Sequence, residues 1–115
     1  MTPYWQWLAG LVDGDGHLAV TGVGGPQLCL AGNRHGISLL ERARALLGRP
    51  SGALVPQSSH GGVVYRETHS HLLRRFVERV GPFLRHSGRL AQLREVCRRL
   101  GEPVPVSVPL GENQG

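Results

Sequence analysis

The stretch that decides the fold is Trp7-Leu8-Ala9-Gly10-Leu11-Val12-Asp13-Gly14-Asp15-Gly16. Its apolar residues have helical spacing, and Thr2-Pro3 upstream provides an N-cap and a first-turn proline. Two aspartates interleaved with glycines end the run, although the helix macrodipole penalises a carboxylate at a helix C-terminus by up to about 1 kcal/mol. A glycine alone would be enough to end the helix. We therefore expect a cationic partner at Asp13-Gly14-Asp15.

The predicted helix has one face suited to the interior of its own domain. Leu8, Leu11 and Val12 form a stripe at helical spacing, with Trp5 or Tyr4 a turn earlier. We expect this stripe to be buried against a sheet.

A second face is made of small residues and one aromatic. It runs through Trp7, Gly10 and Gly14, with Ala9 beside it. Glycine in a helix costs about 1 kcal/mol relative to alanine, so two glycines four residues apart suggest that another backbone comes very close. The simplest candidate is a second copy of the same helix.

Residues Leu8 to Gly16 read LAGLVDGDG, which resembles the signature of the LAGLIDADG homing endonucleases and differs from it only at Val12 and Gly14. The resemblance implies an α+β fold, an αββαββα half-domain whose saddle-shaped antiparallel sheet straddles double-stranded DNA. A single motif implies a homodimer formed through the motif helices, with Trp7, Gly10 and Gly14 at the interface.

The composition is compatible with an anionic partner. The chain has 115 residues, enough for one domain, and a formal net charge of +5, with all 13 basic residues arginine. Arginine suits phosphates and guanine edges, but GC-rich coding would enrich arginine regardless of function. Cys29 and Cys97 form no disulfide or zinc pattern. With no membrane-length apolar run and no signal peptide, we expect a cytoplasmic protein.

Periodicity in the rest of the chain predicts pairs of strands between helices. Strands are expected at 17–22, 27–31, 52–57 and 63–68, and helices at 37–47, 70–80 and 83–100, the last interrupted near Ser87-Gly88. Pro56 indicates an edge or bulged strand, and Tyr65 is expected to face the core. The order predicts a domain over residues 1–101 and a Pro-rich, disordered tail over 102–115.

Several histidine and charged residues are expected to have no binding role. His69 and His71 have strand spacing but no third zinc ligand, so we expect them at a solvated strand end or helix start. The charged residues in and after helix 37–47 are expected to be solvated; they are Glu41, Arg42, Arg44 and Arg49.

The resemblance also implies a metal site. Asp15 matches the acid of the family that binds a divalent metal, and would hold Mg²⁺ or Mn²⁺ with the Gly14 carbonyl as a second ligand. Asp13 matches a cap or structural acid. The lysine that the family usually places near the scissile phosphate falls on Ser87, which leaves Arg85 or Arg89 to stabilise the phosphate.

Further contacts are expected from the strands and loops. The residue that orders water in the family falls on Gly32 or Asn33, of which only Asn33 can act. The candidates for DNA contact are Thr21, Gln27, Arg34, Gln57 and Arg66, and Arg66 is the strongest of them.

Two main functions remain open at this point. The first is a site-specific homing endonuclease that cuts both strands of a long, near-palindromic target and is carried by an intron, an intein or a free-standing element. The second is a catalytically impaired DNA- or RNA-binding protein, a splicing cofactor or regulator, on the same scaffold. A third and less favoured hypothesis is a module that only forms a structural dimer, which would show no salt-sensitive affinity for DNA.

Overall fold

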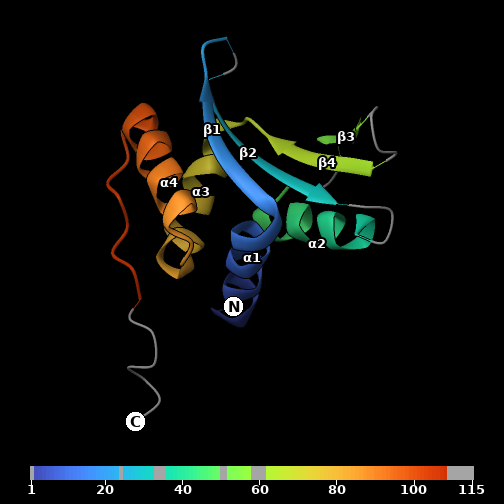
Figure 1. Cartoon of the computed structure of the whole chain (residues 1–115), viewed down its shortest axis with the longest axis horizontal. Helices are drawn as coiled ribbons and strands as arrows, with labels where there is room; N and C mark the ends of the chain where they lie inside the picture. The colour runs from blue at the N-terminus through green and yellow to red at the C-terminus, as the bar shows by residue number, and fades with distance from the viewer. Residues whose placement is uncertain (1, 24, 33–35, 50–51, 58–61, 109–115) are drawn as a thin grey trace.

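Helices and strands follow the order predicted from the sequence. The structure, a computed structural model, describes residues 2–23, 25–32, 36–49, 52–57 and 62–108, except for the side chain of Gln57. Figure 1 shows the elements, which are α1 (Thr2–Asp15), β1 (Gly16–Thr21), β2 (Gly25–Gly32), α2 (Ile37–Leu47), β3 (Leu54–Gln57), β4 (Gly62–Glu67), α3 (Ser70–Arg79), η1 (Gly81–Phe83) and α4 (Ser87–Leu100). The α+β class and the αββαββα order are therefore confirmed.

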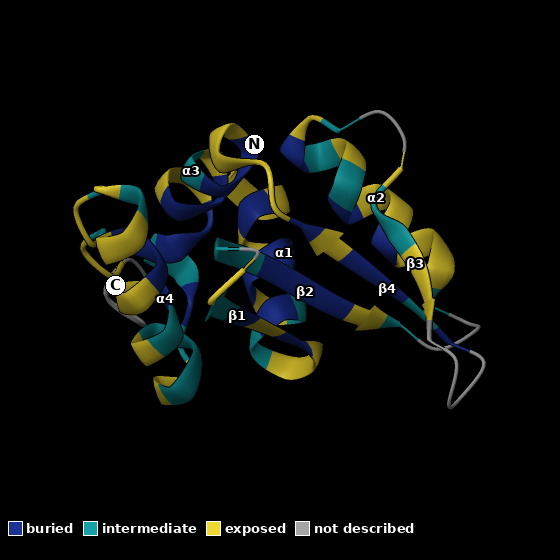
Figure 2. Cartoon of the chain, turned by 90° about the horizontal axis from the view of Figure 1, so that it is seen from above, coloured by how far each residue is buried: buried dark blue, intermediate teal, exposed yellow. Residues whose placement is uncertain are grey.

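The strands form one antiparallel sheet in the order β1-β2-β4-β3. Pro56 lies in β3, an edge strand, where its missing N–H removes no bond from the centre of the sheet. The helices lie below and beside the sheet in Figure 1, and Figure 2 looks onto the opposite face, with the strands in front. We call this opposite side the helix-free face, a name that refers to the described residues.

The core lies between the sheet and the helices. Trp5, Leu8 and Val12 of α1 are buried there, as predicted, and Leu11 is partly buried. Ala9 is only 1% exposed, so it belongs to the core and not to the outer stripe of α1. Other buried side chains come from β1, from both central strands and from the other helices, among them Leu18, Leu28, Leu30, Leu40, Tyr65, Phe76 and Leu93.

The predicted helical region 83–100 is two elements. A 3-10 turn ends at Phe83, and α4 begins at Ser87 after His86, whose extended backbone and Nδ1 cap the new helix. The break occurs because the backbone of Leu84 is also extended. Gln92 of α4 accepts a hydrogen bond from the Leu18 N–H at 2.9 Å, which holds α4 beside the edge of β1.

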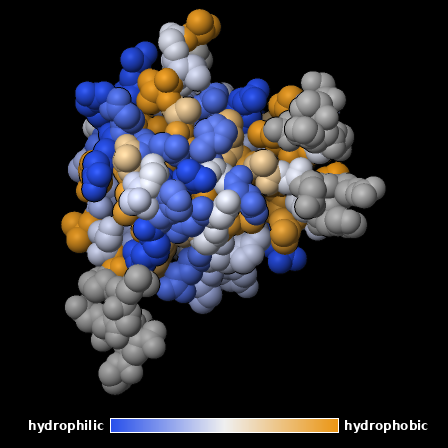
Figure 3. Space-filling model, viewed as in Figure 1, coloured by the Kyte–Doolittle hydropathy of each residue, from blue (hydrophilic) through white to orange (hydrophobic). Residues whose placement is uncertain are grey.

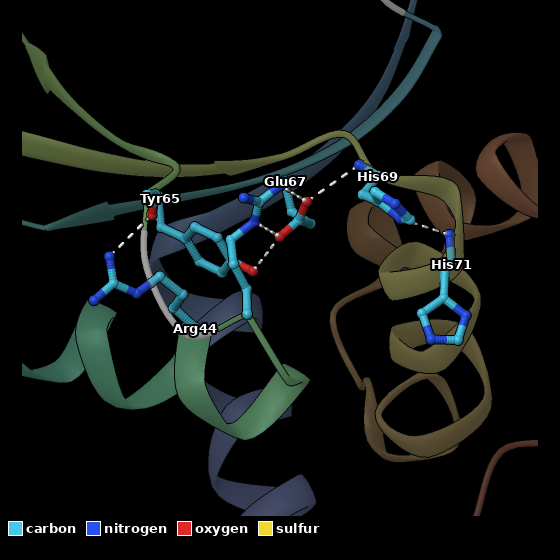
Figure 4. Close-up of polar contacts among 7 residues, drawn as sticks. Arg44, Tyr65, Glu67, His69 and His71 are labelled. Carbon is cyan, nitrogen blue, oxygen red and sulfur yellow. Dashed lines mark hydrogen bonds and ion pairs between the residues drawn. The ribbon is translucent and has the colours of Figure 1, made fainter.

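A buried carboxylate joins β4 to the segment after α2. Glu67 is fully buried, and its oxygens accept hydrogen bonds from the Arg49 guanidinium at 2.7 and 3.0 Å. The Tyr65 hydroxyl and the His69 N–H donate to the same carboxylate at 2.8 and 3.1 Å (Figure 4). His69 also caps α3, so its prediction at a helix start is confirmed.

Two arginines expected to be solvated have partners instead. Arg49 pairs with Glu67, and Arg44 donates to the Gly52 carbonyl at 2.9 Å with only 14% of its side chain exposed. The prediction was wrong for both residues, because their partners come from segments with no local signal: Glu67 is 18 residues from Arg49, and Gly52 is eight residues from Arg44.

The ion pair between Arg49 and Glu67 stays charged near neutral pH. Burial alone would raise the pKa of Glu67, but the hydrogen bonds from Arg49, Tyr65 and His69 hold it below its ordinary value. Burial, together with the hydrogen bond to Glu67, raises the pKa of Tyr65 above its ordinary value. Glu67 therefore stays ionised and Tyr65 stays a hydrogen-bond donor.

Residues 102–108 have no regular secondary structure but contact the domain. The Glu102 carboxylate pairs with Arg74 at 3.0 Å, and the Val108 N–H donates to the Pro82 carbonyl at 2.9 Å. The domain boundary after residue 101 stays a prediction. Across the described ranges, no helix combines the length and apolar character that a membrane span requires.

Candidate functional site

The end of α1 meets the start of α4 at one corner of the domain. Asp13 Oδ2 accepts the Arg85 N–H at 2.9 Å, and Oδ1 accepts the His86 N–H at 3.1 Å. His86 is the N-cap of α4, where unpaired backbone N–H groups carry partial positive charge. The helix-end penalty expected for Asp13 is therefore offset by a second helix, and these bonds support the structural role predicted for it.

Asp15 has a different environment. It is the last residue of α1 and is exposed, and no hydrogen bond or ion pair joins its carboxylate to another residue in the described parts of the chain. Gly14 is exposed beside it, and its carbonyl is one of the four at the helix end that lack an intrahelical partner. These oxygens are hard donors of the kind that Mg²⁺ prefers.

The described residues of one chain do not supply a complete set of metal ligands. Within the described residues, no cluster of three or more histidine, cysteine or acidic side chains could hold a metal. Mg²⁺ is commonly held by one or two carboxylates together with phosphate and water, so Asp15 fits as a partial ligand set.

Both candidate arginines near this corner bind backbone carbonyls. Arg89 Nε donates to the Val12 carbonyl at 3.2 Å, so its guanidinium lies against the last turn of α1. The Arg85 guanidinium donates to the carbonyls of Pro82 and Leu84, at 3.2 Å each, and to that of Val108. Asn33, the remaining candidate catalytic residue, lies outside the described residues.

Some of the predicted DNA-contact residues lie on the helix-free face, where paired residues of neighbouring strands line up in rows across the sheet. Arg66 of β4 is exposed and lies opposite Cys29 of β2, which in turn pairs with His17 of β1. Directly paired residues share a face of the sheet, so the three side chains form one row. The strand pattern indicates that His17 faces outward, but His17 was not selected as a contact, and only the register reveals its alignment with Arg66.

The remaining predicted contacts divide between described and undescribed positions. Gln27 pairs with Ala19 on the same face and is half-buried, and the Thr21 hydroxyl donates to the Gly25 carbonyl at 3.4 Å. Arg34 and the side chain of Gln57 lie outside the described residues. Figure 3 shows hydrophobic atoms at the tip of the β1–β2 hairpin, where Val23 is fully exposed.

The outer stripe of α1, made of Trp7, Gly10 and Gly14, has free space beside its two glycines in the described part of the chain. Cβ atoms built at Gly10 and Gly14 meet nothing within 4 Å. Trp7 is half-buried, and the Arg42 guanidinium lies 6.0 Å from its ring centroid. Since no contact among the described residues requires these glycines, their helix-propensity cost is unexplained by the described part of one chain.

Comparison with solved structures identifies the fold. A structure of the homing endonuclease I-CvuI in complex with its target and Ca matches with a TM-score of 0.68 and 20% identity over 87% of this chain and 67% of that chain. The chain has the homing-endonuclease fold. A second I-CvuI structure, with the I-CreI target and Mg and with the DNA not cleaved, matches with a TM-score of 0.63 and 20% identity over 84% and 65% of the two chains.

The homing-endonuclease fold here is that of a LAGLIDADG half-domain, as the motif predicted. The chain spans about two thirds of the length of the I-CvuI chains. No protein-family model and no curated protein matches it.

Proposed function

We propose that the chain is a homodimeric, divalent-metal-dependent DNA endonuclease that cuts both strands of a long, near-palindromic target. The observation that carries the proposal is the exposed Asp15 at the end of α1, directly before β1 and its helix-free face. The same fold occurs in a homing endonuclease in complex with DNA. The net charge of +5 favours binding to phosphates.

The open glycine stripe supports the dimer. Gly10 and Gly14 have open space beside them that a second α1 could fill, and Trp7 would then lie at the edge of the contact. A two-fold axis along this stripe would place equivalent ends of α1 near each other, because a two-fold interface uses the same patch on both subunits. Two Asp15 carboxylates would then share one region.

Asp15 and the Gly14 carbonyl would hold Mg²⁺ or Mn²⁺. The metal supplies charge neutralisation at the phosphate and activation of water. Arg89, held against the end of α1 by the Val12 carbonyl, would orient the phosphate beside it. Asn33 is proposed to order water, and base and backbone contacts are proposed for Thr21, Gln27, Arg34, Gln57 and Arg66.

A second function rests on residues at the corner where the end of α1 meets the start of α4. Ser87, where the family usually has lysine, is the first residue of α4, and the guanidinium of Arg85 already donates to three carbonyls. This arrangement favours a DNA- or RNA-binding protein that has lost cleavage, such as a splicing cofactor or regulator.

The test compares Asp15→Asn with Glu78→Gln, which removes an exposed carboxylate from α3. A randomised plasmid library is incubated with each protein and Mg²⁺, and salt-dependent DNA binding is measured separately. We expect Asp15→Asn to lower linearisation by more than about a hundredfold, since several kcal/mol of charge stabilisation are lost. Binding should persist, and Glu78→Gln should behave as the unmodified chain.

Full cleavage by Asp15→Asn would refute the assignment of Asp15. An unmodified chain that binds DNA in a salt-sensitive way but never cuts it would favour the second function.

A further inference from the structure

The C-terminal strap, defined as residues 102–108, is fastened to the domain at both of its ends. At its start, Glu102 pairs with Arg74, and its N–H donates to the Cys97 carbonyl at 2.9 Å. At its end, the Val108 N–H donates to the Pro82 carbonyl, and the Val108 carbonyl accepts a hydrogen bond from the Arg85 guanidinium. In Figure 1 the strap runs along the outer side of α4 toward the C-terminus.

The middle of the strap lies close to η1. A Cβ built on Gly81 would come within 2.7 Å of Pro105 Cγ, so glycine is needed for the approach. Pro105 is half-buried, whereas the neighbouring Val106 is 88% exposed. The contact therefore uses the proline ring and not the valine side chains.

Arg85 connects the strap to the acidic end of α1. Its guanidinium binds the carbonyls of Pro82, Leu84 and Val108, while its backbone N–H donates to Asp13. The planar fork of arginine allows one side chain to bind several carbonyls, which lysine cannot do in the same way. Asp13 is two residues before Asp15 in the same helix.

We propose that Arg85 is a positioning residue, and that the C-terminal strap, through Arg85, fixes the backbone amides that hold Asp13 and so sets the direction of the end of α1. The strap is then a working part of the domain. The positioning stands on the contacts alone, whereas its effect on cleavage rests on the proposed function.

Two full-length variants weaken the connection at different points. Arg85→Gln removes the guanidinium, and Val108→Pro removes the N–H that binds Pro82 at the end of the strap, away from the core. The matched controls are Arg94→Gln, an exposed arginine of α4, and Val106→Ala, an exposed side chain of the strap.

Hydrogen exchange reports the positioning without any assay of activity. We expect the Arg85 and His86 amides to exchange about tenfold faster in both variants, the effect of losing about one hydrogen bond. The controls and the amides of the sheet should not change. Unchanged exchange at Arg85 and His86 in both variants would overturn the proposal.

Cleavage kinetics test the catalytic consequence. Both variants should lower kcat about fivefold to tenfold and leave KM for DNA and the Tm nearly unchanged, whereas a general loss of structure would also change KM and Tm. Faster exchange with unchanged kcat would overturn the effect on cleavage. If the unmodified chain cuts no DNA and the exchange behaves as expected, the proposed function fails and the positioning stands.

Discussion

The substitution Gly10→Ala tests whether the glycine face of α1 binds a second chain or is exposed to solvent. It should stabilise a monomer but weaken a dimer. A Cβ at Gly10 meets no atom within 4 Å, so alanine fits the single chain. Alanine is favoured over glycine in a helix by about 1 kcal/mol, which would raise the Tm of a monomer by about 4–8 °C. Against a second α1, the new methyl groups would overpack the contact by about 1–3 kcal/mol and raise the dimer Kd about fivefold to 150-fold.

Sedimentation velocity over a dilution series measures the dimer Kd, and thermal unfolding at several concentrations measures stability. Ala91→Gly, at an exposed position of α4, calibrates the glycine–alanine difference in this chain and should lower the Tm without changing the Kd. A higher Tm for Gly10→Ala at every concentration, with unchanged sedimentation, would refute the dimer face.

Two more substitutions test the buried cluster and the helix-free face. Glu67→Gln should cost about 2–4 kcal/mol at pH 7, because it leaves Arg49, whose side chain is 29% exposed, without its charge partner. Folding lowers the pKa of Glu67, so the carboxylate contributes its full stabilisation above the unfolded pKa of about 4.3 and loses it as the pH falls through the folded pKa. Urea unfolding at pH 7 and at pH 3 should therefore show a smaller difference in the free energy of unfolding between the unmodified chain and Glu67→Gln at pH 3. An equal difference at both pH values would contradict the assignment. Arg66→Gln should weaken DNA binding about tenfold if the guanidinium contacts a base, or reduce the salt slope by about one if it contacts a phosphate. Anisotropy titrations at several salt concentrations distinguish these two results, and an affinity and slope equal to those of Arg94→Gln would remove Arg66 from the interface.

The sequence predicted the order of elements because each element has a clear local signal. Alternation placed Leu18 and Leu28 inward, and Pro56 indicated an edge strand. The pairing of Arg49 with Glu67 had no such signal, since it depends on how β4 lies beside the segment after α2. Ala9 was misplaced because its small side chain fits either face of α1.

The sequence predicted the acidic residues of the candidate site but not all of the contacts that hold them. The motif drew attention to Asp13 and Asp15, and the structure separates them, one bonded to the start of α4 and one exposed. The partners of Arg85 were not predictable, because two of the three carbonyls are local but Val108 is 23 residues away in a segment without periodicity. Metal ligation, DNA contact and dimer formation stay predictions.

Mixing subunits tests the central claim, that two copies of Asp15 act together. Unmodified chain and Asp15→Asn are combined in equal amounts, allowed to exchange, and assayed for double-strand breaks in a plasmid that the unmodified chain cuts. If both subunits must contribute Asp15, only about a quarter of the dimers are competent, and double-strand cleavage falls to about a quarter. A fall to about one half would mean that each chain works alone, and would contradict the account.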